Sequence, residues 1–259
     1  MEVRNQAAGD WLGLSGKRVL IAGAGGIGSA CAAGYAAAGA SIVVADRDQA
    51  RLDLLAEDPA LQGTKVHTLQ ADLSTPGSGA RLVAETVDLL GGLDVLLHCI
   101  GTNDRRPILD ISEEDWENVL RTNLSTAFSL AQAAGRHMVA QKSGKIVVLS
   151  SVSGLLAHKL HGPYAASKGG LNQMVRVMAA EWAAHGVTVN AVAPGYIETS
   201  LTADYLAKPG VREDLVRLVP AGRLGTPEEV VGPVLFLSSV HSGFIAGHVL
   251  YIDGGRTLV

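Results

Sequence analysis

The feature that most constrains this chain is a recurrence of short, apolar, β-branched runs separated by stretches with helical spacing. Seven such runs occur, at residues 18–22, 41–45, 66–70, 94–98, 145–149, 186–192 and 248–252. They do not alternate apolar with polar residues, which is typical of strands that helices cover on both faces. The order of elements therefore predicts one α/β domain, built on a doubly wound parallel sheet of about seven strands flanked by helices.

Three further segments shape the expected organisation. Residues 115–140 have helical spacing after a Ser112 cap, so we expect one long helix there. Residues 199–223 are polar and poorly patterned, which favours a mobile lid over the substrate. We expect residues 1–15 to be an N-terminal extension and residues 16–259 to form the main domain.

Composition excludes several classes of protein. Charged residues make up 18% of the chain and apolar residues 47%, which is too little charge for a disordered protein. The net charge of -4 comes without a long basic run, so we expect no nucleic-acid partner. The two cysteines, Cys31 and Cys99, stand in apolar stretches, which favours a reducing compartment and a cytoplasmic location.

Two other kinds of site are disfavoured. The uncharged run from Val19 to Ala45 is long enough to span a bilayer. Glycines cluster near its start, however, and the rest divides into strand, helix and strand, so we expect no membrane contact. His, Cys and carboxylate residues do not show metal-ligand spacing, so we expect no metal.

A glycine motif follows the first predicted strand and precedes a predicted helix. It reads Gly23-Ala24-Gly25-Gly26-Ile27-Gly28, which combines a tight turn, a backbone without Cβ atoms and the free N–H groups of a helix N-terminus. The alternative is a glycine-rich turn that serves only close packing of helix on strand. In this context the motif predicts Rossmann-type dinucleotide binding through Gly23, Gly25, Gly26, Ile27 and Gly28.

Asp46 ends the second predicted strand, where a carboxylate can accept hydrogen bonds from the adenosine ribose. A 2′-phosphate at that position would meet a like charge. We therefore expect NAD, with NADP less favoured, although the neighbouring Arg47 would soften the preference. The alternative role for Asp46 is the N-cap of a helix over residues 47–57.

Tyr164 and Lys168 are four residues apart in a predicted helix and so share one face. A nearby ammonium stabilises a phenolate, whose unperturbed pKa is about 10, and makes the phenol usable as a general base. This spacing is common by chance, so the pair alone would favour an exposed helix surface. Ser151 follows a predicted strand, at the sheet edge where α/β proteins bind ligands.

Taken in order, these motifs resemble the short-chain dehydrogenase/reductase family from residue 16 to residue 255. The resemblance rests on the glycine motif, Asp72-Leu73, Asn123, the Ser151, Tyr164 and Lys168 set, Pro194-Gly195 and Asp253-Gly254-Gly255. It implies that Tyr164 is the catalytic acid and base, and that Lys168 lowers the pKa of Tyr164 and holds the nicotinamide ribose. It further implies that Ser151 hydrogen-bonds the reacting oxygen and that Asn123 supports a water relay.

The resemblance also assigns cofactor contacts. Asp72 and Leu73 would lie at the adenine, and Ile197 and Thr199 would fix the carboxamide. The family's glycine loop is one residue longer. The family's Asn-Asn-Ala-Gly segment, which steadies the central strand and the adenosine ribose, here reads His98-Cys99-Ile100-Gly101. These departures concern cofactor binding and leave the proton-transfer set unchanged.

The loop that follows Gly101 resembles that of gluconate 5-dehydrogenase-like members of the family. Its Arg105 and Arg106 would clamp a carboxylate at two points. The alternative is a solvated basic loop whose arginines pair with Asp104 or Asp110. His158, His161 and Tyr196 are further candidates for the substrate pocket, although loop histidines are more often surface residues.

We therefore expect an NAD-dependent oxidoreductase that interconverts a secondary alcohol and a ketone, on a polyol or sugar acid. The alternatives are an NADP-dependent ketoreductase for lipid, steroid or polyketide carbonyls and a non-catalytic dinucleotide sensor. The resemblance implies a homotetramer or homodimer, to which the C-terminal residues 257–259 would contribute a subunit contact.

Overall fold

Seven strands form one parallel sheet in the computed structural model, which describes residues 10–259. The strands are β1 (Arg18–Ala22), β2 (Ser41–Asp46), β3 (Val66–Gln70), β4 (Val95–His98), β5 (Gly144–Leu149), β6 (Val187–Pro194) and β7 (Val249–Ile252). Their spatial order is β3-β2-β1-β4-β5-β6-β7. The predicted fold class is confirmed, and the order reverses between β1 and β4, where doubly wound proteins bind ligands at the carboxyl ends of the strands.

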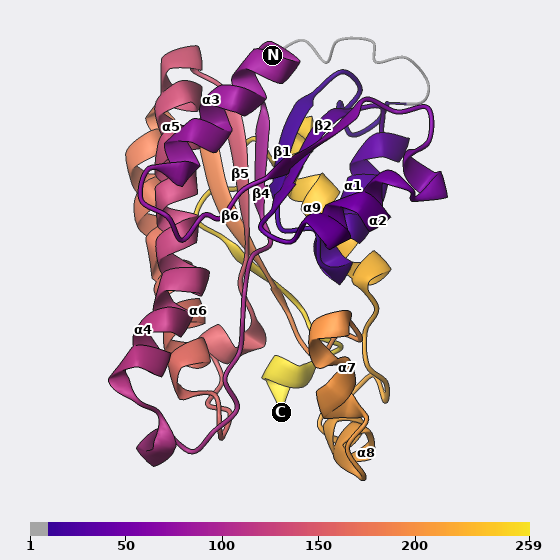
Figure 1. Ribbon diagram of the computed structural model, residues 1–259, viewed down its shortest axis with the longest axis vertical. Coiled ribbons are helices and arrows are strands. Elements are labelled where there is room, and N and C mark those ends of the chain that lie inside the picture. The colour runs from indigo at the N-terminus through magenta and orange to yellow at the C-terminus, as the bar shows by residue number, and fades with distance from the viewer. Residues whose placement is uncertain (1–9) are drawn as a thin grey trace.

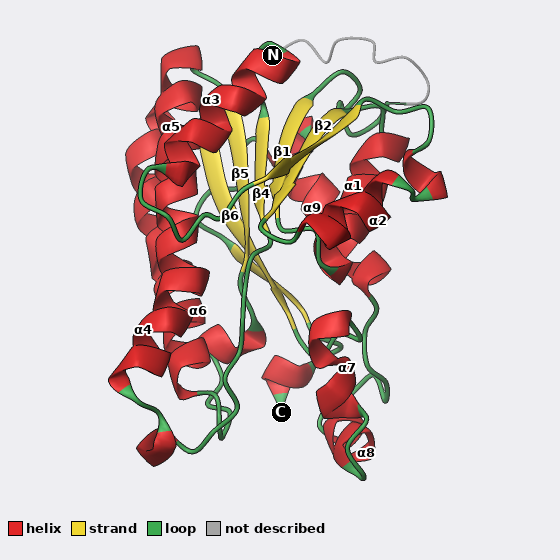
Figure 2. Ribbon diagram, in the orientation of Figure 1, coloured by secondary structure: helices red, strands yellow, loops and turns green. Residues whose placement is uncertain are grey.

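Helices cover both faces of the sheet (Figures 1 and 2). They are α1 (Gly26–Ala37), α2 (Gln49–Ala56), α3 (Ser78–Leu90), α4 (Glu113–Leu120), α5 (Thr126–Gln141), α6 (Gly162–Trp182), α7 (Ser200–Leu206), α8 (Val211–Arg217) and α9 (Pro227–Ser238). Helices α3, α5 and α6 pack on one face, and α1, α2 and α9 on the other. The near-continuous apolar runs are explained by these two layers, because each strand buries side chains on both sides.

The chain is helical over the whole of residues 115–140, as expected, but a π-helical turn interrupts the α-helix. The chain forms α4, a π-helical turn at Arg121–Ser125, and then α5. The π-helical turn carries Asn123, which is fully buried. Apolar spacing continues through such a turn, so periodicity alone did not reveal it; π-turns of this kind are frequent at functional sites.

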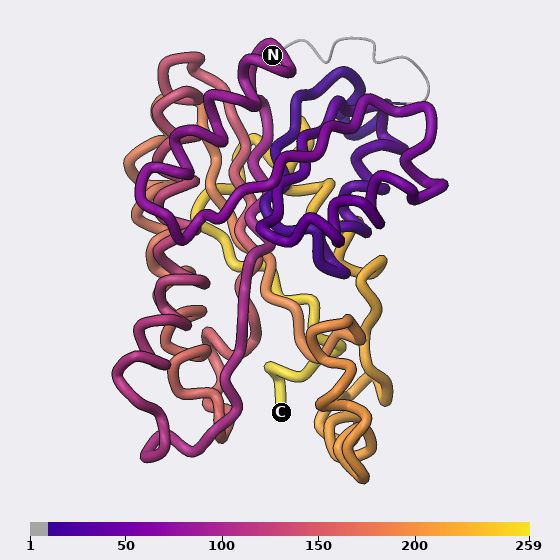
Figure 3. Tube along the Cα trace, in the orientation of Figure 1, coloured from indigo at the N-terminus to yellow at the C-terminus, as the bar shows by residue number. Residues whose placement is uncertain are grey.

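The polar segment 199–223 contains α7 and α8 rather than irregular chain. Thr199 begins α7 with a capping box that pairs it with Thr202. The segment lies against the C-terminal end of the chain, where Ala221 N–H donates to the Gly254 carbonyl at 3.0 Å (Figure 3). Residues far apart in sequence therefore meet at this corner of the molecule.

Part of the expected N-terminal extension, residues 1–9, lies outside the described residues. Residues 10–15 pack on the domain: Leu14 is fully buried, and Val240 N–H donates to the Leu12 carbonyl at 3.1 Å.

The uncharged run 19–45 folds as β1, α1 and β2. Nowhere in residues 10–259 is a helix both long and apolar enough to cross a membrane. Over the same residues, no group of three or more His, Cys, Asp or Glu side chains is arranged to hold a metal ion.

Candidate active site

Two cavities lie at the carboxyl end of the sheet. The first, which we call the glycine-loop cavity, has a volume of about 230 Å³. Most of the residues predicted to bind the cofactor line it, namely Gly23, Gly25, Gly26, Ile27, Gly28, Asp46, Arg47, Asp72, Leu73, Gly101 and Thr199.

Three glycines shape this cavity in different ways. Gly28 packs so closely that a Cβ atom there would lie 1.9 Å from the Gly23 carbonyl oxygen. Gly23 has φ +106°, and its Cβ would lie 3.1 Å from the Cys99 backbone. A Cβ on Gly25 would meet nothing within 4 Å, and Gly25 is the N-cap residue of α1, where it provides no side-chain hydrogen bond. The first N–H groups of α1 therefore face an open cradle, which fits the pyrophosphate of a dinucleotide.

Asp46 is nearly buried and ties the glycine loop to the end of β2. Its Oδ2 accepts the Ala24 N–H at 2.8 Å, and its Oδ1 accepts the Asp48 N–H at 2.9 Å. It does not cap α2, because Asp48 does so by accepting the Ala50 N–H at 3.1 Å. Each Asp46 oxygen can still accept a second hydrogen bond, so the carboxylate remains compatible with a ribose hydroxyl.

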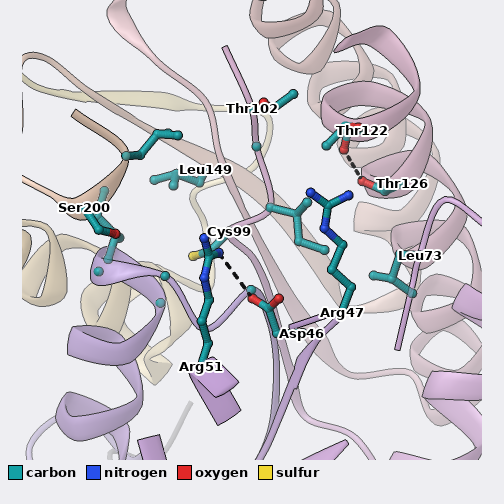
Figure 4. Close-up of a pocket in the computed structure, with 18 of the residues that line it drawn as sticks. Asp46, Arg47, Arg51, Leu73, Cys99, Thr102, Thr122, Thr126, Leu149 and Ser200 are labelled. Carbon is teal, nitrogen blue, oxygen red and sulfur yellow. Dashed lines mark hydrogen bonds and ion pairs between the residues drawn. The ribbon is translucent and has the colours of Figure 1, made fainter. Parts of the chain in front are cut away.

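Two arginines flank Asp46 in the same cavity. Figure 4 shows Arg47 and Arg51 on either side of the carboxylate, and Arg51 Nη1 lies 3.9 Å from Asp46 Oδ2. Sequence reasoning missed Arg51, although its position four residues after Arg47 was a usable signal. Guanidinium groups suit phosphate, so the charge at this end of the cavity is not set by Asp46 alone.

The side chains of His98 and Cys99, which replace the two asparagines of the family's segment, lie in the core or pack against it. His98 is fully buried, and its Nε2 lies 3.0 Å from Thr126 Oγ1, while its Nδ1 has no partner among the described residues. Burial lowers the pKa of His98 to about 3 and also raises the pKa of the Cys99 thiol. Both side chains are therefore neutral near pH 7.

The second cavity, which we call the tyrosine cavity, has a volume of about 280 Å³, near the lower end for small-molecule sites. The predicted residues that line it are Arg105, Ser151, His158, Tyr164, Gly195, Tyr196 and Ile197. Leu201 of α7 lines both cavities, so they adjoin.

Tyr164 stands in the first turn of α6 and Lys168 one turn later. Lys168 is 2% exposed; its Nζ donates to the Leu149 carbonyl at 2.7 Å and lies 5.6 Å from the centre of the Tyr164 ring. Burial lowers the pKa of Lys168 to about 8. Burial raises the pKa of Tyr164, while the hydrogen bond with Ser151 and the charge of Arg105 lower it. The three predicted catalytic side chains are thus brought together.

Asn123 joins this group from the π-helical turn. Its Oδ1 accepts the Thr102 N–H at 2.7 Å, and its Nδ2 donates to Ser167 Oγ at 2.9 Å. A Cβ on Gly101 would lie 3.6 Å from both Asn123 Oδ1 and Lys168 Nζ, so both side chains approach the same point of the loop.

The two arginines predicted to form a clamp separate in the structure. Arg105 lies in the tyrosine cavity, with its Cζ 4.3 Å from the centre of the Tyr205 ring and its buried Nε without a partner among the described residues. Arg106 lies outside the cavity, paired with Asp104 and with Asp115, the latter at 2.7 Å. The predicted pair therefore reduces to Arg105, because acidic neighbours hold Arg106 elsewhere.

Three other predicted residues line neither cavity: Asn123, Lys168 and Pro194. All three are buried, and Pro194 is the last residue of β6. Sequence reasoning did not assign Asn103 or Tyr205, which also line the tyrosine cavity. They carry no linear signal, because only the fold brings the loop after β4 against α7.

Comparisons with known proteins extend over nearly the whole chain. The family described as Enoyl-(Acyl carrier protein) reductase matches residues 21–257. Gluconate 5-dehydrogenase of Gluconobacter oxydans is 37% identical, over 96% of this chain and 98% of that protein. The 5-keto-D-gluconate 5-reductase of Escherichia coli K12 is 34% identical, over 95% and 97%. The crystal structure of a gluconate 5-dehydrogenase from Burkholderia cenocepacia with NADP and tartrate superposes with a TM-score of 0.92, at 35% identity over 98% and 100%.

Proposed function

This chain belongs to the short-chain dehydrogenase/reductase family, in its gluconate 5-dehydrogenase-like branch, and from that premise we propose that it interconverts a gluconate-like sugar acid and the corresponding keto acid. It is an NAD(P)-dependent oxidoreductase that acts on CH–OH groups.

Arg105 is the observation that carries the substrate class. Its guanidinium lies in the same cavity as Ser151 and Tyr164, and its buried Nε has no partner among the described residues. A buried donor without a partner costs about 1–3 kcal/mol, which a substrate carboxylate would relieve by a charge-assisted hydrogen bond. The gluconate and 5-ketogluconate relatives support the same class.

The proposed chemistry separates a proton from a hydride. A bound dinucleotide would supply the hydride acceptor for the alcohol carbon, and in the reverse direction the hydride donor for the ketone. Tyr164, as the phenolate, takes the hydroxyl proton while the C=O bond forms, and Ser151 donates a hydrogen bond to that oxygen. Lys168 holds positive charge beside the Tyr164 ring, and Asn123 orders the Thr102 loop next to Lys168.

Sixteen residues are proposed to hold the dinucleotide, on the resemblance and on their positions: Gly23, Gly25, Gly26, Ile27, Gly28, Asp46, Arg47, Asp72, Leu73, Gly101, Tyr164, Lys168, Pro194, Gly195, Ile197 and Thr199. We further propose that NAD is preferred, because Asp46 would repel a 2′-phosphate. Arg47 and Arg51 oppose that preference, and NADP is present in the Burkholderia structure. Both cofactors therefore belong in every assay.

Three wider features of the proposal follow. Residues 199–223 act as a lid, which the position of α7 beside both cavities supports. Leu258 and Val259 are exposed and would be covered in a homodimer or homotetramer. Cys31 and Cys99 are free thiols, which is consistent with a cytoplasmic location.

Arg105→Leu tests the substrate class, with Arg106→Leu as the matched control. We expect Arg105→Leu to lower kcat/KM for gluconate by about 10- to 100-fold, the worth of a charged hydrogen bond, and to change kcat/KM for a neutral polyol far less. Arg106→Leu should leave the ratio between the two substrates unaltered. An equal loss on both substrates for Arg105→Leu would assign Arg105 a structural role and remove the support for a sugar acid.

A further inference from the structure

Four rings form a continuous row along the tyrosine cavity: Tyr196, His158, His161 and Tyr164. Adjacent ring centres are 5.8, 5.7 and 6.0 Å apart along this row, in tilted or edge-on arrangements. We call this row the ring wall. It ends on Tyr164, so whatever lies along it extends away from the reacting oxygen.

His158 is fixed within the wall at both nitrogens. Its Nδ1 lies 2.8 Å from Ser153 Oγ, and its Nε2 lies 3.4 Å from the Tyr196 hydroxyl. Burial lowers the pKa of His158 to about 4, and the charges of His161 and Arg256 add to that effect. The ring is therefore neutral near pH 7, and through it Ser153 orients the Tyr196 hydroxyl at the cavity.

His161 has a defined tautomer. Its Nδ1 lies 2.8 Å from the Lys159 carbonyl oxygen, which can only accept a hydrogen bond, so Nδ1 carries the proton. Burial lowers the pKa of His161, opposed by this hydrogen bond and assisted by Arg105. In the neutral ring, Nε2 is then a free acceptor on a side chain that lines the cavity.

We propose that the ring wall recognises the hydroxylated carbon chain of the substrate, and thereby selects a polyhydroxy acid over a keto acid without hydroxyls. The inference rests on the proposed function, and it adds the residues that distinguish a sugar acid from other carboxylates. Arg105 would bind only the carboxylate. Neutral imidazole and phenol groups, in contrast, can donate hydrogen bonds to hydroxyls and accept hydrogen bonds from them. A site built for hydroxyls rejects analogues that lack them, because a polar group such as His161 Nε2 is then left without a partner.

The test compares two ketones, 5-keto-D-gluconate and 5-oxohexanoate. They share a six-carbon chain, a C5 carbonyl and a carboxylate, and they differ in the hydroxyls. The measured quantity is the ratio of their kcat/KM values, in the wild type, His158→Phe, His161→Phe and His161→Gln. His67→Phe is the control, because His67 is exposed on β3 and lines neither cavity.

We expect the wild type to favour 5-keto-D-gluconate and each His→Phe change in the wall to lower the ratio at least tenfold. His161→Gln should recover part of that loss, because its amide can accept a hydrogen bond near the position of Nε2. Tyr196→Phe, which removes only a hydroxyl, should also lower the ratio. If the histidine variants unfold on heating or fail to bind dinucleotide, the result for Tyr196→Phe decides the test.

Two results would be informative in different ways. A wild-type preference for 5-keto-D-gluconate that survives in the His158, His161 and Tyr196 variants would overturn the role of the ring wall and leave the proposed function in place. A wild type that reduces neutral ketones but neither of the two keto acids would contradict the proposed function itself, and the ring wall with it.

Discussion

The glycine-loop cavity and the tyrosine cavity adjoin, yet they are built from different parts of the chain. At one end the first cavity is bounded by backbone, because the glycine loop and the N-terminus of α1 supply its shape and its donors, while Asp46, Arg47 and Arg51 add side chains beside it. The second is made of side chains that reach in from separate loops and from α7. A backbone cradle suits a ligand common to a family, whereas a side-chain cavity can change its ligand by a few substitutions. The particular chemistry of this chain therefore resides in the tyrosine cavity.

The largest expected effect separates the two cavities outright. Tyr164→Phe removes the proton acceptor from the tyrosine cavity, so kcat should fall by about 10²- to 10⁴-fold, the usual worth of general acid–base catalysis. Dinucleotide affinity should change little, because the variant removes one hydroxyl and leaves the other fifteen proposed contacts, the glycine loop included, in place. Steady-state kinetics and titration of dinucleotide fluorescence measure the two quantities, and substantial residual turnover would remove Tyr164 from the proposed role.

Two glycines sharpen the claim that the cradle is backbone. Gly28→Ala places a methyl group against the Gly23 carbonyl and should cost about 1–3 kcal/mol of folding stability, together with dinucleotide affinity. Gly25→Ala meets no protein atom within 4 Å, so it should weaken dinucleotide binding while the stability of the free protein is kept. Urea unfolding and binding titrations distinguish the two variants, and equal behaviour would contradict the cradle.

How far each cavity could be predicted follows from the same contrast. The glycine motif is encoded in six consecutive residues, so the cradle at Gly23–Gly28 could be located from the sequence. The separation of Arg105 from Arg106 could not be predicted, because it depends on the ion pair between Arg106 and Asp115 of α4, which holds the Arg106 guanidinium outside the tyrosine cavity. The ring wall likewise needs the loop after β5 and the residue after β6 to meet in space.

The strands were predictable because each is a short β-branched run that two helical layers bury. Two features could not be predicted: the π-helical turn at Asn123 and the hydrogen bond from the Ala24 N–H to the Asp46 carboxylate. Both depend on backbone positions that the pattern of side chains does not report.

A pH experiment probes the core beneath the glycine-loop cavity. The pKa of His98 is about 3 in the folded protein and near 6.5 when unfolded, so below pH 6.5 the unfolded chain binds more protons. Stability should therefore fall as the pH falls, with His98 contributing a loss of about 2 kcal/mol between pH 7 and pH 5. Urea unfolding of the wild type and His98→Asn at both pH values isolates this loss, and parallel changes would contradict it.

The smallest expected effect concerns the choice of dinucleotide. Asp46→Ser removes a negative charge from the site where a 2′-phosphate would bind. The repulsion between two such charges in water is about 1 kcal/mol, so the ratio of the affinities for NAD and NADP should fall about fivefold. Because Asp46 also holds Ala24, affinity for both cofactors should fall, and only their ratio is diagnostic. Arg51→Leu, as the counterpart, should weaken NADP selectively. An unchanged ratio in both variants would place the selectivity elsewhere.

The most direct test of the account is the change in nicotinamide absorbance with NAD and with NADP across gluconate, other sugar acids, neutral polyols, cyclic alcohols and steroids, with Tyr164→Phe as the blank. The account predicts turnover confined to carboxylated polyols, because Arg105 lines the same cavity as Ser151 and Tyr164. Turnover only of neutral or bulky alcohols would contradict it, and would return Arg105 to a purely structural contact with Tyr205.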